Sequence, residues 1–292
     1  MPSPSVHNDD DLAFLRSIYP ARLFERSPSP PPARPSTPPL VTLTYAQSLD
    51  GKIAGAGGTQ IRLSGDDSMR LTHRLREHHD SILVGVGTVL NDDPQLNVRI
   101  PNLLPQAQQP QPIILDSNLR TAPTCKLITN FATKVGKQPI LVCSESTLLA
   151  TDGQARAASL SEAGARIEAC RTDDDGHLSL TSLLASPSLA EAFGRALMVE
   201  GGSSVITSFL GSRLVDLVVV TVAPVLVGAE GVSMARPGVR RPKRPAVLMP
   251  EKLMSFVEQI ELPHLEHVAT KTFGKDTVFA CKPSKPAHGA AS

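Results

Sequence analysis

Short apolar runs alternate with amphipathic stretches along the chain after residue 40. Several of these runs are continuously apolar, which is typical of strands that are covered on both faces of a sheet. The predicted strands cover residues 41–46, 80–86, 112–116, 139–143, 165–170, 195–200 and 217–223. The stretches between them, such as MRLTHRLREHH and SVITSFLGSR, have helical periodicity. This alternation predicts an α/β fold with a mainly parallel central sheet flanked by helices.

The two ends of the chain depart from this alternation. The stretch HLEHVATKTFGKDTVFACK predicts two strands around a Gly-Lys-Asp turn, which form an antiparallel hairpin at one edge of the sheet. Residues 1–39 hold ten of the 26 prolines, and SPSPPPARPSTPP has the polyproline character of a linker. Before it, DLAFLRSIYPARL has the spacing of a short helix, and the sequence leaves open whether that helix docks. We expect a proline-rich N-terminal extension over 1–39, one domain over 40–283 and a flexible tail over 284–292.

Two predicted strands end on glycine and lead directly into polar residues. They are ILVGVGT, which is followed by Asn-Asp-Asp-Pro, and LMVEGGSSVITSFL. Ligands of open α/β sheets bind beyond the carboxyl ends of the strands, where glycine admits close approach and a helix N-terminus attracts anions. One such turn alone is more often just a tight turn, but two in one domain favour a ligand that carries phosphate. We expect Ser203 or Ser204 to cap the second helix or to bond a phosphate oxygen.

Polar and basic side chains near these turns add to the candidate site. Asn-Asp-Asp-Pro is ordinary turn chemistry, but Thr88 and Asp92 are also suited to bond sugar hydroxyls or an amide. Arg76 lies in the helix predicted over MRLTHRLREHH, and Arg99 follows Asp92 by seven residues. A pair of arginines can clamp a phosphate, although solvation is the commoner fate of any single arginine. We expect Ser64 to cap the Arg76 helix, with two aspartates in its first turn.

Composition and charge exclude several classes of function. The formal charge is +1, aromatic residues make up 3% of the chain and there is no Trp, so neither an electrostatic field nor a stacking platform favours nucleic acid. The most apolar stretch, which begins at Leu214, contains Asp216 and Pro224 and is shorter than the ~20 residues of a membrane span. No secretory signal is visible, and the N-terminus is too acidic for a mitochondrial presequence. We expect a cytoplasmic protein without a membrane partner.

The residues that bind metals or form disulfides show no recognised spacing. The cysteines lie far apart and none forms C-x-x-C, which argues against a zinc ribbon and a disulfide framework. Those in LVCSE, IEACR and VFACK are expected to be small buried hydrophobes. His73, His78 and His79 form no H-E-x-x-H motif, so no metal is expected. No nucleophile elbow is present and no residue is assigned as the general acid.

Four segments of the chain occur in the order and spacing of one family: VTLTYAQSLDGKIA, LTHRLREHHDSILVGVGTVLNDDPQLNVR, PIILDS and LMVEGGSSVI. They closely resemble the fungal and archaeal 2,5-diamino-6-ribosylamino-4(3H)-pyrimidinone 5′-phosphate reductases of riboflavin biosynthesis, over roughly residues 40–282. The same domain forms the C-terminal half of the bacterial bifunctional deaminase–reductase, whose zinc deaminase signature is absent here. The resemblance implies a dihydrofolate-reductase-like fold, a homodimer and NADPH as cofactor. It also implies reduction of the ribosylamine to a ribitylamine by hydride transfer to C1′ of the opened imine.

The resemblance also implies a role for individual positions of this chain. Substrate contacts are implied for the phosphate-binding Arg76 and Arg99, for Leu96 beside them and for Glu200. Cofactor contacts are implied for Ala46, Thr88, Asp92, Ser117, Gly201, Gly202, Ser203 and Ser204, with Ala46 near the nicotinamide, Ser117 near the adenosine and the 201–204 turn at the pyrophosphate. Asp50 could bind nearby amides as a structural residue or orient the reacting centre, and the structural role is favoured. Gln60 and Arg62 stand where the bacterial pattern has a serine and a tryptophan.

Two other functions remain open at this point. A pteridine or folate reductase shares the implied fold, although the Arg76 and Arg99 pair favours a phosphorylated substrate over folate. A dinucleotide-binding sensor or scaffold would use the proline-rich N-terminus to hold a partner. Deletion of residues 1–38 is expected to leave the turnover of an enzyme intact and to cost a scaffold its partner.

Overall fold

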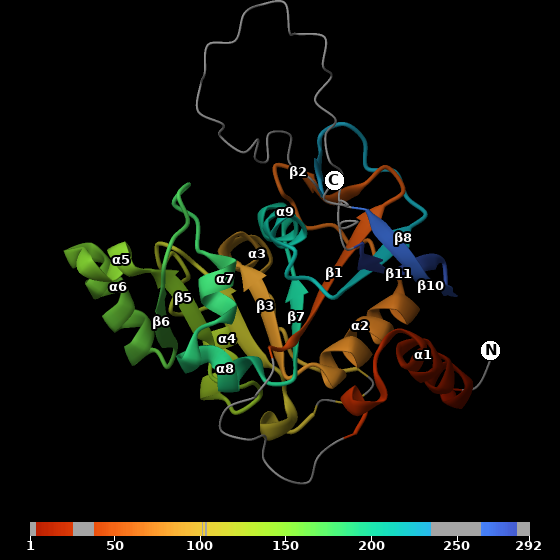
Figure 1. Ribbon diagram of the computed structural model, residues 1–292, viewed down its shortest axis with the longest axis horizontal. Helices are drawn as coiled ribbons and strands as arrows, with labels where there is room; N and C mark the ends of the chain where they lie inside the picture. The colour runs from red at the N-terminus through yellow and green to blue at the C-terminus, as the bar shows by residue number, and fades with distance from the viewer. Residues whose placement is uncertain (1–3, 26–37, 101, 103, 235–263, 285–292) are drawn as a thin grey trace, which may run out of the picture.

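A nine-stranded sheet lies between two layers of helices in the computed structural model, which describes residues 4–25, 38–100, 102, 104–234 and 264–284 (Figure 1). The strands run in the order β10-β11-β8-β1-β7-β3-β4-β5-β6. Their bounds are β1 Leu40–Ser48, β3 Ser81–Gly85, β4 Gln111–Leu115, β5 Ile140–Ser144, β6 Arg166–Cys170, β7 Ala196–Glu200, β8 Leu217–Ala223, β10 Leu265–Phe273 and β11 Asp276–Pro283. A small antiparallel pair, β2 Lys52–Ala56 and β9 Gly231–Ser233, stands apart from this sheet.

Every strand pair from β8 to β6 is parallel, and only β11 and β10 are antiparallel to their neighbours. The hairpin turns at the predicted Gly-Lys-Asp sequence, where Gly274 has a φ of 60° that glycine adopts readily. The predicted α/β architecture, a mainly parallel sheet with an antiparallel C-terminal hairpin, is therefore confirmed.

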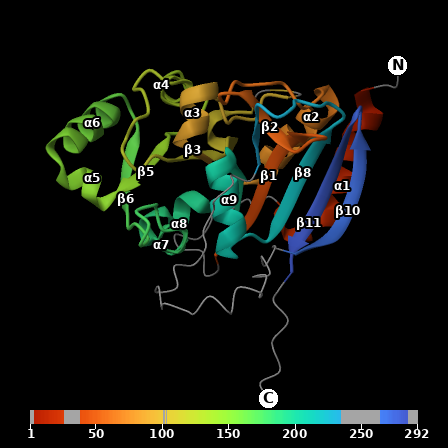
Figure 2. The same ribbon diagram turned by 90° about the horizontal axis from the view of Figure 1, so that it is seen from above.

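Helices cover both faces of the sheet, as the continuously apolar strands require. Figure 2 shows α2, α3 and α4 on one side and α7, α8 and α9 on the other. The helix bounds are α1 Pro4–Ile18, α2 Asp66–His78, α3 Val86–Asp92, α4 Lys126–Ala132, α5 Glu145–Leu149, α6 Thr151–Glu162, α7 Leu180–Leu184, α8 Pro187–Phe193 and α9 Ser203–Ser212. Leu71 and Leu75 of α2 pack on one face, and Phe209 of α9 packs on the other. Strands β3, β4, β5 and β7 thus bury alternate residues in two separate cores.

The N-terminal helix α1 packs on α2 and β10, which settles the question that the sequence left open. Leu15 is fully buried, and the Phe14 ring lies edge-to-face against Phe273 at 5.4 Å. Asp11 is also fully buried and accepts a 2.7 Å hydrogen bond from Nε of Arg70. Removing residues 1–38 therefore removes core side chains, and we expect that truncation to destabilise the domain. Residues 26–37 and 285–292 lie outside the described residues, so the predicted linker and tail stay predictions.

The N-terminus of α2 is capped by the hairpin and not by Ser64, so that prediction is wrong. The N-cap position is Gly65, and no side chain of its own segment caps the helix. Instead, the carboxylate of Asp276, fully buried at the start of β11, accepts a 2.6 Å hydrogen bond from the Gly65 N–H and a further one from the Ser68 hydroxyl. Gly274 lets the turn approach the helix, because a Cβ there would lie 2.7 Å from Asp67. The cap comes from the far end of the chain, where local sequence gives no signal for it.

Candidate functional site

The carboxyl edge of the sheet has a step beside β7. Strand β1 pairs with β7 only as far as Thr44, which lies opposite Glu200, whereas its pairing with β8 continues to Ser48. Residues 45–48 of β1 therefore have no strand partner on the β7 side. Ala46 lies on this overhang, half-buried, two residues beyond the level at which β7 ends. This position at the step agrees with the backbone contact expected of Ala46.

The two glycine turns lie next to each other at this step. A Cβ on Gly202 would be 3.3 Å from Oγ1 of Thr88, so the side chain of Thr88 borders the second turn. Gly87 faces open space, since nothing lies within 4 Å of a Cβ built there. At Gly85, by contrast, a Cβ would lie 2.7 Å from Cγ2 of Val205 in α9. Gly85 and Gly202 are thus explained by close packing against Val205 and Thr88, while Gly87 leaves room for a ligand.

The predicted serine cap of α9 is wrong. The N-cap is Gly202, in an extended conformation and without a side-chain cap, and the helix begins at Ser203. Both serines lie in the first turn, where Ser203 is buried and Ser204 is exposed. The ten residues of α9 nevertheless direct its first N–H groups toward the step, as the sequence predicts for an anion site.

The two aspartates after α3 have different surroundings. Asp93 ends the helix in the left-handed region at a φ of 41°, and its carboxylate accepts the Lys126 N–H at 2.8 Å. Asp92 is half-buried, and this burial raises the pKa of its carboxyl. Asp93 therefore stabilises the turn after α3. Asp92 remains as the candidate for a ligand contact.

Arg76 and Glu200 form a two-pronged ion pair. Nε of Arg76 donates to Oε1 of Glu200 and Nη2 donates to Oε2, both at 2.7 Å. The remaining guanidinium nitrogen, Nη1 of Arg76, donates to the carbonyl of Asn97 at 3.2 Å. The two side chains are only 10% and 19% exposed. The structure thus joins two residues that were expected to contact the substrate separately, and it commits most donors of Arg76 to protein partners.

Arg99 is the cation of this cluster whose guanidinium is open to a ligand. Its Nη1 donates to Oδ1 of Asn97 at 3.2 Å, and within the described residues no carboxylate lies within ion-pair distance of it. Burial and the nearby charge of Arg76 both lower the pKa of Arg99. Leu96 is buried at the start of the same segment, with a φ of 48°. Asn97, which contacts both arginines, was missed because nothing in the QLNVR sequence marks it except its place beside Arg99.

Ser117 and Asp50 lie at other points of the carboxyl edge. Ser117 follows β4 and is half-buried, and its carbonyl accepts the Thr147 hydroxyl at 2.7 Å. Asp50 accepts the N–H groups of Val227 and Gly228 at 3.1 and 2.8 Å. The Ser48 hydroxyl and these two amides lower the pKa of Asp50 to about 2. The structural role expected of Asp50 is therefore confirmed.

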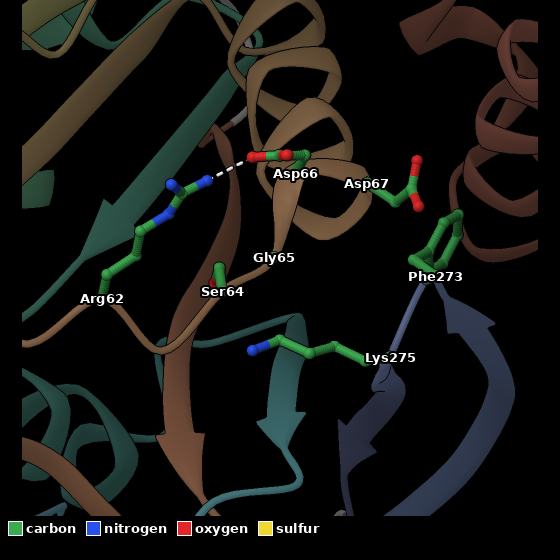
Figure 3. A pocket seen from close by; sticks show the side chains of 8 residues that line it. Arg62, Ser64, Gly65, Asp66, Asp67, Phe273 and Lys275 are labelled. Atoms are coloured by element: carbon green, nitrogen blue, oxygen red, sulfur yellow. Dashed lines mark hydrogen bonds and ion pairs between the residues drawn. The ribbon is translucent and has the colours of Figure 1, made fainter.

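A pocket of about 440 Å³ opens at the N-terminus of α2, next to the β10–β11 turn (Figure 3). Arg62, Asp67 and Lys275 line it, and Arg62 pairs with Asp66. None of the residues predicted to bind cofactor or substrate lines this pocket. It is therefore separate from the step that holds Thr88, Glu200 and the glycine turns.

Cysteines and potential metal ligands show no second centre. All four cysteines are free; the three at 125, 143 and 170 are buried, whereas Cys281 in VFACK is only half-buried, against expectation. In the described part of the chain, the only cluster with metal-ligand spacing is Asp173, Asp175 and His177. It is a surface turn, where Oδ1 of Asp173 accepts the N–H of His177 at 3.0 Å. No described helix is long and apolar enough to cross a membrane.

The fold defines the class of protein: an α/β domain with a mainly parallel sheet and an antiparallel C-terminal hairpin. Residues 39–279 match the model of the RibD C-terminal domain. The chain therefore belongs to the RibD C-terminal domain family, and the resemblance seen in the sequence is confirmed.

Relatives from fungi and bacteria agree with this assignment. The chain is 35% identical over 208 residues to the 2,5-diamino-6-ribosylamino-4(3H)-pyrimidinone 5′-phosphate reductase of Candida glabrata, with 68% of this chain and 80% of the relative covered. It is 33% identical over 202 residues to the riboflavin biosynthesis protein RibD of Aquifex aeolicus, covering 69% of this chain and 51% of that one. The riboflavin biosynthesis reductase Rib7 of Saccharomyces cerevisiae has a similar structure, with a TM-score of 0.65 and 25% identity over 94% of this chain and all of that one.

Proposed function

We propose that this chain is an NADPH-dependent reductase of riboflavin biosynthesis, acting on 2,5-diamino-6-ribosylamino-4(3H)-pyrimidinone 5′-phosphate. The observation that carries the proposal is the arrangement at the sheet edge. Arg99, open to an anion, lies in one cluster with the Arg76–Glu200 pair, and Glu200 immediately precedes the glycine turn that Thr88 borders. Two relatives that bear this enzyme name each cover 68% of this chain.

The residues at the step fit a dinucleotide that carries phosphates. Gly87 leaves space for close approach, and the N-terminus of α9 supplies N–H donors for the pyrophosphate. Thr88, Asp92 and Ala46 border the same space, with Ser117 at the adenosine end and Ser203 and Ser204 in the first turn. When bound, NADPH would supply a hydride for C1′ of the ring-opened imine, whose nitrogen would take a proton from water. The protein contributes position and electrostatics to this reaction.

The charges of the substrate side suit a phosphate ester. Arg76 and Glu200 neutralise each other, so Arg99 leaves this cluster with one net positive charge. A phosphate is bound best by a guanidinium whose donors are not already shared with a carboxylate. We therefore assign the phosphate mainly to Arg99. Arg76 holds both oxygens of Glu200, which fixes that carboxylate toward the substrate.

The proposal is tested by mixing the purified protein with NADPH and the ribosylaminopyrimidine phosphate, and by following oxidation of the reduced nicotinamide. Substrate-dependent oxidation with a ribityl product by mass is the expected result. Reduction of a folate instead would favour the pteridine reductase, and binding of NADPH without any turnover would favour the sensor. Arg99→Ala is expected to raise KM, with Arg62→Ala as the control outside the site.

The proposed enzyme is a homodimer in the cytoplasm. Light scattering after gel filtration gives the oligomeric state, and a single-copy mass would contradict the dimer. Cell fractionation with the full chain tests the location.

A further inference from the structure

The segment that carries Arg99 is held between two buried polar side chains that the reaction does not use. His73 of α2 is fully buried, and its Nδ1 accepts the backbone N–H of Arg99 at 3.3 Å. Gln109, only 1% exposed, lies on the other side of the segment, just before β4. Neither residue stands out in the sequence, because both look like ordinary polar residues next to predicted elements.

The side-chain amide of Gln109 forms the pair of backbone hydrogen bonds that a neighbouring strand would form. Its Oε1 accepts the Val98 N–H at 2.7 Å, and its Nε2 donates to the Val98 carbonyl at 3.0 Å. The same Nε2 also donates to the Leu104 carbonyl at 2.9 Å. One side-chain amide thus satisfies both backbone groups of the residue directly before Arg99. Buried backbone groups are rarely left unpaired, so this contact strongly restricts where the segment lies.

His73 holds the N–H of the Val98–Arg99 peptide group, whose carbonyl Gln109 holds. Burial, together with the charges of Arg76 and Arg99, lowers the pKa of His73 to about 3. The ring is therefore neutral, and Nδ1 keeps its lone pair as an acceptor for the Arg99 N–H. Arg76, one turn further along α2, holds the Asn97 carbonyl of the same segment. Two residues of one helix thus hold the peptide groups on either side of Val98.

We infer that His73 and Gln109 are positioning residues that set the Arg99 segment for binding of the substrate phosphate. The inference rests on the proposed function, since Arg99 is the phosphate ligand there. Within the described residues, the guanidinium itself is held by one protein partner, Asn97, at 3.2 Å. The position of the guanidinium therefore depends on the backbone of Arg99, and His73 and Gln109 hold that backbone.

Two replacements of His73 separate positioning from packing. His73→Leu keeps the shape but puts a methyl group where Nδ1 accepts, whereas His73→Asn keeps an acceptor atom on Cγ. We expect His73→Leu to raise KM for the phosphorylated substrate about tenfold with kcat changed less than about twofold. His73→Asn is expected to restore KM to within about twofold, and Gln109→Met to act in the same direction as His73→Leu. His78→Leu is the matched control, because the His78 ring packs on Phe24 at 4.7 Å.

The phosphate-free ribosylaminopyrimidine gives a readout that a general loss of structure does not. Its KM is expected to be the same in the wild type and in His73→Leu, since it offers Arg99 nothing to bind. Equal KM increases for both substrates, or equal damage from His73→Asn and His73→Leu, would overturn the inference.

Titration with ribose 5-phosphate tests the inference without turnover. Weaker binding by His73→Leu than by the wild type supports it, even if the wild type fails to oxidise NADPH with the proposed substrate. In that case the proposed function fails and the positioning role stands. Equal binding by both proteins, or no binding by the wild type, would overturn the positioning role.

Discussion

Replacing Asp276 tests whether α2 is capped from the other end of the chain. Asp276→Ala removes a buried carboxylate that accepts the Gly65 N–H at 2.6 Å and the hydroxyl of Ser68. Loss of a helix cap costs about 1 kcal/mol, and hydrogen bonds to a charged acceptor are worth about 1.5–3 kcal/mol. We therefore expect the free energy of unfolding to fall by about 2–4 kcal/mol. For a domain of this size, that lowers Tm by roughly 5–15 °C.

Ser64→Ala is the matched control for this prediction. Ser64 precedes the N-cap and has the residue type that the local sequence favours as a cap, but it does not cap the helix. Its replacement is expected to change stability by less than about 0.5 kcal/mol. Urea unfolding followed by far-UV circular dichroism gives both values. If Ser64→Ala were as costly as Asp276→Ala, or if Asp276→Ala were neutral, the long-range cap would be refuted.

Three further predictions follow from the packing and the charges. Leu15→Ala, in helix α1, is expected to lower the free energy of unfolding in urea by about 2–5 kcal/mol, because the Leu15 side chain is fully buried. An unchanged free energy of unfolding would contradict the packing of α1 on the core. Arg76→Lys is expected to lower kcat/KM about tenfold, since one ammonium cannot hold both oxygens of Glu200, and wild-type turnover would contradict this. Burial lowers the pKa of His79 from 6.5 to about 4. Between these two pH values, His79 is protonated in the unfolded chain and neutral in the folded chain. Stability must fall as the pH drops from about 7 to 5, and His79→Gln should remove about 1–2 kcal/mol of that loss; an unchanged slope would show that His79 does not titrate as expected.

Local pattern predicted the nine strands of the main sheet, but not the small pair of β2 and β9. Continuously apolar strands can only be stable when helices cover both faces, so the layers follow from the run at 80–86 and others like it. The hairpin turn at Gly274 was predicted because only a few residues accept its backbone conformation. The family, too, was visible from the order and spacing of its segments.

Contacts between distant segments were decided only by the tertiary structure. The cap on Gly65 comes from Asp276, and Gly85 is small because Val205 packs against it. Arg76 and Glu200 lie 124 residues apart, so no local signal shows that they satisfy each other. Sequence pattern reports which residues are suited to a charge, a cap or a turn. Which partner each one finds depends on the geometry of the packed sheet and helices, and that is decided only when the whole chain has folded.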